Sequence, residues 1–352
     1  MNRIERPGRE RWLDSLKGFG ILLVIFGHVL SGYLDAWTFP RAYYSFYYVR
    51  TWIYSFHMPL FFLISGFTFT LSYWQDRRLR RGGFMRQMGS LFWLYVLFAL
   101  IQWLVKQAVP ELVNESYDLS DLTRMFIKPL GNFWYLYVLF VIYGIAALTR
   151  LPNWPLRWLL VPGAVAVIAA DLRLDWTRLT LYRVLYHFFF FAVGSALCRR
   201  RQLLSSVKLT GIAAMGLATA AFFHVFWWVW DWYANWKLGI ALGACYLLAA
   251  LFWRHPVLAN SRLLQRCGKH CLELYLLHTF FTGGLRSLLP LLGVTAPWIS
   301  VWVNFGVSTA VCLFLAYLAD RFRWTDVLFR PARFFRRLRS HRTSGAKIDI
   351  PE

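Results

Sequence analysis

The amino-acid sequence predicts an all-α polytopic membrane protein with about ten transmembrane helices and both termini in the cytoplasm. Three observations carry this prediction: the composition, the length of the apolar blocks and the placement of the basic residues. Of the 352 residues, 58% are hydrophobic and 19% aromatic, and only 16% are charged. Disordered chains are poor in apolar and aromatic residues, so this composition excludes disorder. A soluble globule is also excluded, because the apolar blocks are too long for one small core to bury.

Apolar blocks of about 18 or more residues are candidate transmembrane helices, because about 20 helical residues cross a hydrocarbon core of roughly 30 Å. In chain order, we predict spans at 13–34, 52–74, 91–109, 133–149, 156–171, 180–198, 208–230, 238–254, 271–290 and 297–319. The fifth span is short, and Pro155 and Pro162 lie near its start. The first span is too long for a signal peptide and lacks a small-residue cleavage site, so we interpret it as a helix of the protein.

Basic residues are distributed unevenly between the predicted loops. The chain has 39 Lys and Arg against 17 Asp and Glu, a net charge of +22. With a cytoplasmic N-terminus, 28 of the basic residues fall in inner segments and 9 in outer loops. Because Lys and Arg in short loops favour the cytoplasmic side, this bias predicts the orientation. The charge therefore reports topology in a multi-pass inner-membrane protein, and no nucleic-acid partner is expected.

The chain divides into a membrane domain, residues 1–330, and a basic cytoplasmic tail, residues 331–352. The tail contains the run RFFRRLR at 333–339, which we expect to lie on anionic lipid of the bilayer. No long soluble segment interrupts the spans. The chemistry must therefore lie on the helices and their short connections.

Three ionisable residues occur in the first span. Ionisable groups are expensive inside a membrane and indicate a functional site. Lys17 lies 11 residues and Asp14 lies 14 residues before His28. At about 100° per residue, the three side chains fall within roughly 60° of one another. They predict one wall of a polar passage, with Lys17 near the cytoplasmic end and His28 roughly 16 Å further along the axis.

Other spans add polar residues. His57 lies near the outer end of the second span, at a depth similar to that of His28, and Ser65-Gly66 permits a close helix approach or a local break. The sixth span offers Arg183 and His187 in its outer half, and the ninth offers Glu273 and His278 in its cytoplasmic half. The aromatic residues at 43–48, with Trp37 and Trp52, could stack on sugar rings, but an interfacial belt is favoured. Cys267-Gly-Lys-His270-Cys271 matches no closed zinc pattern, so no metal is expected.

Two stretches resemble the acyltransferase-3 family of integral membrane acyltransferases, in particular its fucose 4-O-acetylase-like and exopolysaccharide O-acetyltransferase branch. They read RWLDSLKGFGILLVIFGH at 11–28 and FHMPLFFLISGF at 56–67. The family pattern is a basic residue, ten positions and an essential histidine, which here are Lys17 and His28. Weaker matches are FWYL at 133–136, FFFFAVG at 188–194 and CGKHCLELYLLH at 267–278, where Cys271 replaces the usual serine.

The resemblance implies a ten-helix fold and transfer of an acyl group from an acyl-CoA, most often acetyl-CoA, with no bound cofactor. His28 would act as general base toward a sugar hydroxyl or carry the acyl group transiently. His57 would orient His28 or the acceptor. Asp14 and Lys17 would pair and limit the cost of burying either charge, or Lys17 would instead bind the donor. We expect the donor to be bound by Arg77, Arg78, Arg80, Arg81 and Arg86, together with Ser65, since arginine forms bidentate bonds with phosphates. The residues expected to support the acceptor are Trp134, Glu273, His278, Arg183 and His187.

The competing interpretation is a transporter or flippase for lipid-linked sugars or small acids, which would share the ten helices and the polar stripe. A third is a structural assembly factor of a polysaccharide-export complex. For the enzyme, the expected partners are acyl-CoA, a sugar or polysaccharide and polysaccharide-biosynthesis proteins. The acceptor stays open among exopolysaccharide, O-antigen, periplasmic glucan, peptidoglycan and an antibiotic scaffold. The acyl group stays open between acetyl, succinyl and longer chains.

Overall fold

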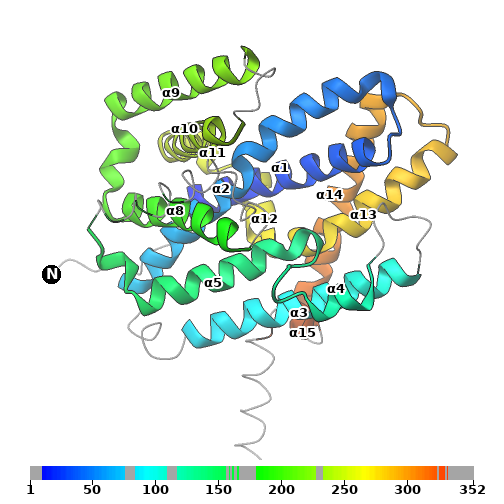
Figure 1. Cartoon of the computed structure of the whole chain (residues 1–352), viewed down its shortest axis with the longest axis horizontal. Coiled ribbons are helices and arrows are strands. Elements are labelled where there is room, and N and C mark those ends of the chain that lie inside the picture. The colour runs from blue at the N-terminus through cyan, green and yellow to red at the C-terminus, as the bar shows by residue number, and fades with distance from the viewer. Residues whose placement is uncertain are drawn as a thin grey trace, which may run out of the picture.

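The computed structural model describes residues 10–75, 84–108, 117–155, 158, 161, 165, 180–226, 233–322, 325–329 and 331. Every regular element in this part of the chain is helical, which confirms the all-α prediction there. The α-helices are α1 Arg11–Asp35, α2 Tyr43–Gln75, α3 Phe84–Ala108, α4 Leu119–Thr123, α5 Trp134–Leu148, α8 Thr180–Arg199, α9 Val207–Phe226, α10 Tyr233–Arg254, α11 Pro256–Ala259, α12 Arg262–Lys269, α13 Cys271–Leu291, α14 Pro297–Arg321 and α15 Asp326–Phe329. Figure 1 shows their arrangement.

Helices lie at nine of the ten predicted spans, and the fifth, 156–171, falls almost wholly outside the described residues. Within the described part of the chain, six helices are long and apolar enough to cross a membrane: Arg11–Asp35, Tyr43–Tyr73, Gln87–Ala108, Gly131–Leu148, Thr180–Arg199 and Pro297–Arg321. The apolar parts of α9 and α10 are shorter, Val207–Phe222 and Leu238–Arg254. The class of membrane protein is thus confirmed, whereas the count of ten spans and the location of the termini stay predictions.

α2 begins at Tyr43, well before the predicted start at residue 52. The aromatic run that precedes the apolar block continues the same helix, because Tyr43, Tyr47, Arg50 and Tyr54 recur every three or four residues and share one face. The Tyr43 and Tyr47 rings stack with centroids 6.0 Å apart. The Arg50 guanidinium carbon lies 5.2 Å from the Tyr47 ring centroid. The predicted start at residue 52 was therefore set by where the apolar block begins, whereas the helix itself starts earlier, in the aromatic segment.

α1 and α2 form the centre of the molecule (Figure 1). In the most apolar stretch of each helix, 67% of the residues are buried in α1 and 72% in α2. The corresponding shares are 28% in α3 and 33% in α14. α1 contacts α2, α12, α13 and α14, and α2 also contacts α8 and α10. The two helices with the most polar residues in their spans are therefore shielded from lipid by the others, as the cost of exposing polar groups to hydrocarbon requires.

Two glycine contacts bring helix backbones together. A Cβ atom on Gly66 would overlap the carbonyl oxygen of Phe191, and one on Gly194 would overlap that of Leu63, where α2 crosses α8. The predicted close approach at Ser65-Gly66 is thus confirmed. In the same way, Gly18 of α1 and Gly268 of α12 allow their helices to meet backbone to backbone. Small residues permit such contacts between membrane helices.

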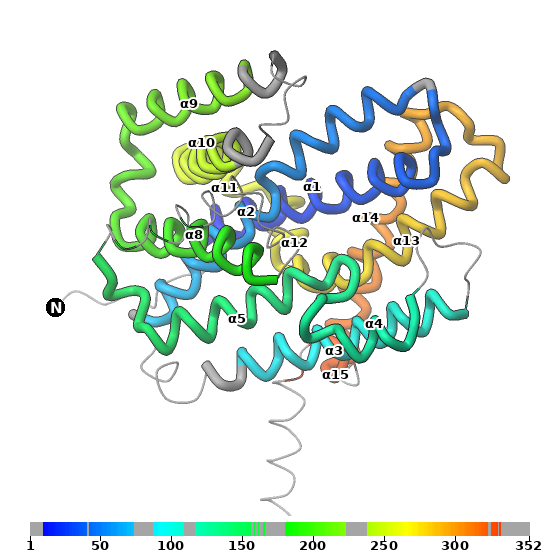
Figure 2. Tube along the Cα trace, in the orientation of Figure 1, coloured from blue at the N-terminus to red at the C-terminus, as the bar shows by residue number. Residues whose placement is uncertain are grey.

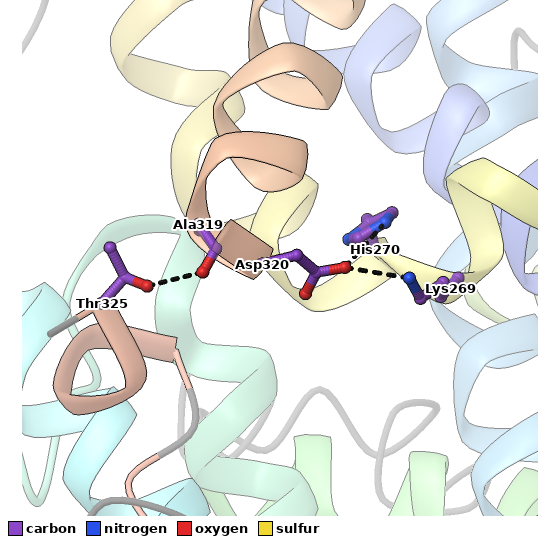
Figure 3. A network of polar contacts seen from close by, with 5 residues as sticks. All are labelled: Lys269, His270, Ala319, Asp320 and Thr325. Atoms are coloured by element: carbon purple, nitrogen blue, oxygen red, sulfur yellow. Dashed lines mark hydrogen bonds and ion pairs between the residues drawn. The ribbon is translucent and has the colours of Figure 1, made fainter. Parts of the chain in front are cut away.

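Polar contacts fix the end of α12 against the end of α14 (Figure 3). Lys269 Nζ donates to an Asp320 carboxylate oxygen over 2.9 Å, and His270 Nε2 lies 3.8 Å from the same oxygen. Thr325 Oγ1 donates to the carbonyl oxygen of Ala319 over 2.7 Å and holds the turn that follows α14. After α12, the chain enters α13 at Cys271, and α13 packs against α1 (Figure 2).

Candidate functional site

A cavity of about 740 Å³ opens between α1, α2, α5, α8 and α13. It is lined mainly by polar and aromatic side chains: His28, Ser31, Asp35, Tyr47, Arg50, Thr51, Tyr54, Ser55, His57, Met58, Pro59, Asn132, Trp134, Tyr182, Arg183, Tyr186, His187 and Tyr275. Three of the histidines predicted for the site are therefore brought into one cavity. Its size is that of a small-molecule binding site. We refer to it as the histidine cavity.

A second cavity of about 250 Å³ lies further toward the start of α1. Its lining includes Lys17, Ser65, Tyr135, Cys271 and Tyr275. Met58 and Tyr275 line both cavities, so the two meet at these side chains. We refer to the smaller one as the lysine cavity. Together the two cavities follow α1 from Lys17 to beyond His28, as the predicted passage requires.

Helical periodicity produces this lining. Along α1, the cavity-lining residues are Lys17, Ile21, Val24, His28, Ser31 and Asp35, at alternating spacings of four and three. Along α2, they include Tyr47, Arg50, Tyr54, Met58, Phe61 and Ser65, at the same spacings. Residues at these intervals share one helix face. Each helix thus presents a single stripe to the passage.

His28 is held by a residue that the sequence analysis did not identify. The Tyr54 hydroxyl lies 3.2 Å from His28 Nδ1, and Ser31 Oγ donates to the same hydroxyl over 3.0 Å. Tyr54 comes one helical turn before His57 on the stripe of α2, and this spacing was the signal that could have found it. His28 Nε2 is left to face the cavity, because Tyr54 engages the other ring nitrogen.

Among the described residues no hydrogen bond joins His57 to His28, and Tyr54 takes that position beside His28. The other predicted role of His57, orienting the acceptor, stays a prediction. The Tyr54 and His57 rings are in contact, with centroids 4.8 Å apart. His57 Nδ1 lies 2.8 Å from the carbonyl oxygen of Ile53, and His187 Nδ1 lies 2.7 Å from that of Arg183. A carbonyl can only accept, so Nδ1 carries the proton in both residues and Nε2 presents a lone pair.

His278 lies against His28, with ring centroids 5.0 Å apart. It was predicted in the cytoplasmic half of its span and His28 in the outer half, and that separation is wrong. Gly18 of α1 and Gly268 of α12 are in contact, and each histidine lies ten residues beyond its glycine, His28 on α1 and His278 on α13. His278 Nδ1 bonds to the carbonyl oxygens of Leu274 and Tyr275 at 3.1 and 2.8 Å. Within the described residues, its Nε2 is buried without a hydrogen-bond partner.

Lys17 does not pair with Asp14, contrary to the prediction. Among the ion pairs formed by the described part of the chain, none includes Lys17. Lys17 faces the lysine cavity, whereas Asp14 is 8% exposed and lines neither cavity. The backbone of α12 covers this end of α1, since Gly268 packs on the carbonyl oxygen of Asp14. Lys17 therefore offers a cationic group to a ligand in the cavity.

The remaining predicted residues fall into three groups. Trp134, Arg183 and His187 lie together at one wall of the histidine cavity, with the Arg183 guanidinium carbon 5.0 Å and the His187 ring 5.2 Å from the Trp134 ring. Ser65 lies in the lysine cavity, 3.4 Å from the Tyr135 hydroxyl, and Glu273 is buried near the start of α13, outside both cavity linings. The predicted donor residues Arg77, Arg78, Arg80 and Arg81, and the side chain of Arg86, lie outside the described residues.

A helical membrane fold that positions a histidine ring nitrogen in a polar cavity is suited to proton or acyl transfer. The chain belongs to the acyltransferase-3 family: the family profile, described as an acyltransferase domain, matches residues 10–320. Membership confirms the resemblance stated from the sequence motifs and places the protein among the acyltransferases.

Two relatives carry the name nodulation protein NolL. The one from Mesorhizobium japonicum is 28% identical over 187 residues, which are 49% of this chain and 45% of the relative. The one from Sinorhizobium fredii is 27% identical over 195 residues, 51% of this chain and 47% of the relative. The chain thus spans about half the length of these relatives. No solved structure matches it significantly.

Proposed function

We propose that the protein is an O-acyltransferase that moves an acetyl group from acetyl-CoA to a sugar hydroxyl of a cell-surface glycan. One observation carries the proposal: His28 lines a polar cavity that adjoins, at the side chains of Met58 and Tyr275, a smaller cavity lined by Lys17. Two substrates could thus approach the same imidazole from opposite ends of α1. Family membership supports the acyl-transfer chemistry.

The lysine cavity is the proposed path of the donor. Its apolar walls, from Ile21, Val24 and Phe61, suit the pantetheine arm, and Lys17 at its end supplies a positive charge for the phosphates of CoA. The arginines between residues 77 and 86 would bind the same phosphates. The distribution of Lys and Arg supports a cytoplasmic location for this end, where acetyl-CoA is available.

The histidine cavity is the proposed site of transfer. With Nδ1–H donating to the Tyr54 oxygen, His28 Nε2 has a lone pair that can take the proton of the acceptor hydroxyl. The hydroxyl oxygen attacks the thioester carbonyl carbon, and the bond from that carbon to sulfur breaks. The CoA thiolate then takes the proton from the imidazolium, which restores neutral His28.

A covalent route uses the same nitrogen. Here Nε2 attacks the thioester carbonyl carbon, the carbon–sulfur bond breaks, and the CoA thiolate takes the imidazole proton, which leaves a neutral acyl-imidazole. The hydroxyl oxygen then attacks the acyl carbon, the bond from that carbon to Nε2 breaks, and the hydroxyl proton returns to the imidazole by way of a neighbouring histidine. His278 Nε2 and His57 Nε2 would serve as acceptors for the hydroxyl proton in this second step, since their Nδ1 atoms are engaged by backbone carbonyls. Rapid acid quench with labelled acetyl-CoA and no acceptor separates the routes, because only the covalent one labels the protein.

Within a cell, the proposed setting is the inner membrane, with polysaccharide-biosynthesis proteins as partners. Proton NMR of purified surface polysaccharide from wild-type and deletion cells would identify the acetylated glycan through the signals that disappear. The same comparison distinguishes acetyl from succinyl or longer acyl groups. A carrier of lipid-linked sugars would lower the amount of polysaccharide and leave its acylation intact.

The enzyme proposal is tested with the purified full chain in detergent. We expect acetyl-CoA and CoA to raise the thermal unfolding temperature, and His28→Ala to abolish acetyl transfer while that stabilisation persists. Tyr54→Phe should lower kcat roughly fivefold at unchanged KM for acetyl-CoA, because one neutral hydrogen bond is worth about 1 kcal/mol. Tyr44→Phe, on the same helix and with Tyr44 70% exposed, is the matched control. Normal transfer by a stably inserted His28→Ala protein would refute the proposal.

A further inference from the structure

Two arginines face the histidine cavity, Arg50 from α2 and Arg183 from the first turn of α8. Among the described residues that line this cavity, Asp35 is the one carboxylate, and it is not within ion-pair distance of either guanidinium. A positive charge inside a membrane domain is costly unless an anion compensates it. The described residues supply no such anion to Arg50 or Arg183.

Aromatic rings hold both guanidinium groups in place. The Arg50 guanidinium carbon lies 5.2 Å from the Tyr47 ring centroid and 5.8 Å from that of Tyr54. That of Arg183 lies 5.0 Å from the Trp134 ring. Stacking engages the face of a guanidinium and leaves its N–H groups, which point along its edge, available to an oxyanion. Among the described residues, the rings thus orient both guanidinium groups while no hydrogen bond uses their N–H groups.

Tyr54 connects this charged wall to the reacting histidine. Its ring lies beside Arg50, and its hydroxyl contacts His28 Nδ1 at 3.2 Å. A ligand whose anionic group meets Arg50 would therefore place its neighbouring atoms close to His28. The arrangement fits a sugar that carries a negative charge near the hydroxyl to be acylated, and the aromatic side chains of Tyr47 and Trp134 line the same cavity.

We propose that the histidine cavity recognises an anionic acceptor, through Arg50 and Arg183. The inference rests on the proposed acyl transfer and names the acceptor class as a sugar bearing a carboxylate or a phosphate ester. These two sources share the oxyanion that a guanidinium binds with charge-assisted hydrogen bonds. The donor's phosphates, by contrast, belong to the lysine cavity.

The test measures binding separately from transfer. The full chain in detergent is titrated with D-glucuronate, D-glucose 1-phosphate and D-glucose, and thermal unfolding is recorded at each concentration. We expect stabilisation by the anionic probes and little by glucose. Stabilisation by glucuronate alone would identify the charged group of the acceptor as a carboxylate, and stabilisation by glucose 1-phosphate alone would identify it as a phosphate ester. Stabilisation by both would show that the site recognises negative charge in either form. Equal stabilisation by all three probes, or by none, overturns the inference.

Variants assign the effect to the two arginines. Arg50→Gln and Arg183→Gln should each weaken binding of the anionic probe roughly 10- to 100-fold, the range for loss of a charged hydrogen bond. Arg183→Lys keeps the charge and should lose less. Arg124→Gln, an exposed arginine outside the cavity lining, is the control and should bind as wild type.

Acetyl-CoA serves as the internal reference. Each arginine variant should retain stabilisation by acetyl-CoA, which shows that it is folded and that its donor site is intact. Loss of acetyl-CoA binding with unchanged anion binding would place the arginines in the donor site and overturn the inference. If wild type binds the anionic probes but neither binds acetyl-CoA nor transfers its acetyl group, the acyltransferase proposal fails while the anion site stands.

Discussion

At the scale of single residues, backbone carbonyls determine the proton positions on three of the four histidines around the cavity. His57, His187 and His278 each point Nδ1 at a carbonyl oxygen three or four residues earlier in the same helix. Their Nε2 atoms therefore present lone pairs to the interior. His28 differs because its Nδ1 meets the Tyr54 hydroxyl, which can donate or accept. His28 alone among the four can change its tautomer without losing this bond, and this suits it to transferring protons.

His278 carries a buried ring nitrogen that costs stability, and the proposed reaction gives this nitrogen a role. Its Nε2 is buried and has no hydrogen-bond partner within the described residues, and such a group costs about 1–3 kcal/mol. We expect His278→Leu to leave the free energy of unfolding unchanged or to raise it by about 1 kcal/mol. Acetyl transfer should fall at least about tenfold, because the lone pair beside His28 is lost. Thermal unfolding and kcat, measured on the same preparation, check both expectations.

The next residue on α13 provides the control. Thr279 Oγ1 is likewise buried without a partner among the described residues, and Thr279 lines neither cavity. Thr279→Val removes a hydroxyl of similar environment and should gain stability without losing activity. A His278→Leu protein with wild-type kcat would show that the unpaired nitrogen has no part in the reaction.

At the scale of elements, the glycine contact between α1 and α12 sets the register that brings His28 to His278. A Cβ on Gly268 would overlap the carbonyl oxygen of Asp14, so α12 would have to move away from α1. We expect Gly268→Ala to destabilise the protein by about 1–3 kcal/mol, the usual cost of overpacking. Because α13 follows α12 directly, the shift should also separate the two histidines and lower kcat. Chemical unfolding in detergent and the transfer assay measure the two effects.

A second glycine tests whether the contact is responsible. Gly284 lies in α13, and a Cβ built on it would have no atom within 4 Å. Gly284→Ala should stabilise the helix by up to about 1 kcal/mol, since alanine is the better helix former. Equal losses in the two variants would mean that helix flexibility, rather than the packing of α12 on α1, explains the result.

Much of the helical layout could be predicted, because apolar length and helical periodicity are local properties of the sequence. The stripe that joins Lys17 to His28 follows from 3.6 residues per turn and lines both cavities as expected. Contacts between elements were harder to predict. Tyr54 lies outside the recognised sequence motifs, so nothing in them pointed to it. The contact between His278 and His28 depends on where α12 packs, which the sequence of a single helix does not reveal. The Asp14–Lys17 pair failed for the same reason, since α12 covers one end of α1.

At the scale of the whole molecule, the lysine cavity lies toward the start of α1 and the histidine cavity, lined by His28, lies toward its end. In the proposed reaction, donor and acceptor approach from these two ends. The uneven distribution of Lys and Arg predicts that the Lys17 end faces the cytoplasm, with 28 basic residues in inner segments and 9 in outer loops. The histidine cavity, with Arg50 and Arg183, would then open to the outside. The acceptor would therefore be acylated on the outer side of the membrane.

This orientation can be measured by cysteine labelling in intact cells. Tyr44 at the start of α2 is 70% exposed and Val257 in α11 is 85% exposed, so a cysteine at either position is accessible to reagent. We expect a membrane-impermeant maleimide to label Tyr44→Cys without permeabilisation and Val257→Cys only after it. The unsubstituted chain, with three of its five cysteines buried, gives the background. The reverse pattern would place the histidine cavity on the cytoplasmic side, where both donor and acceptor would be cytoplasmic and the passage along α1 would have no role in bringing them together.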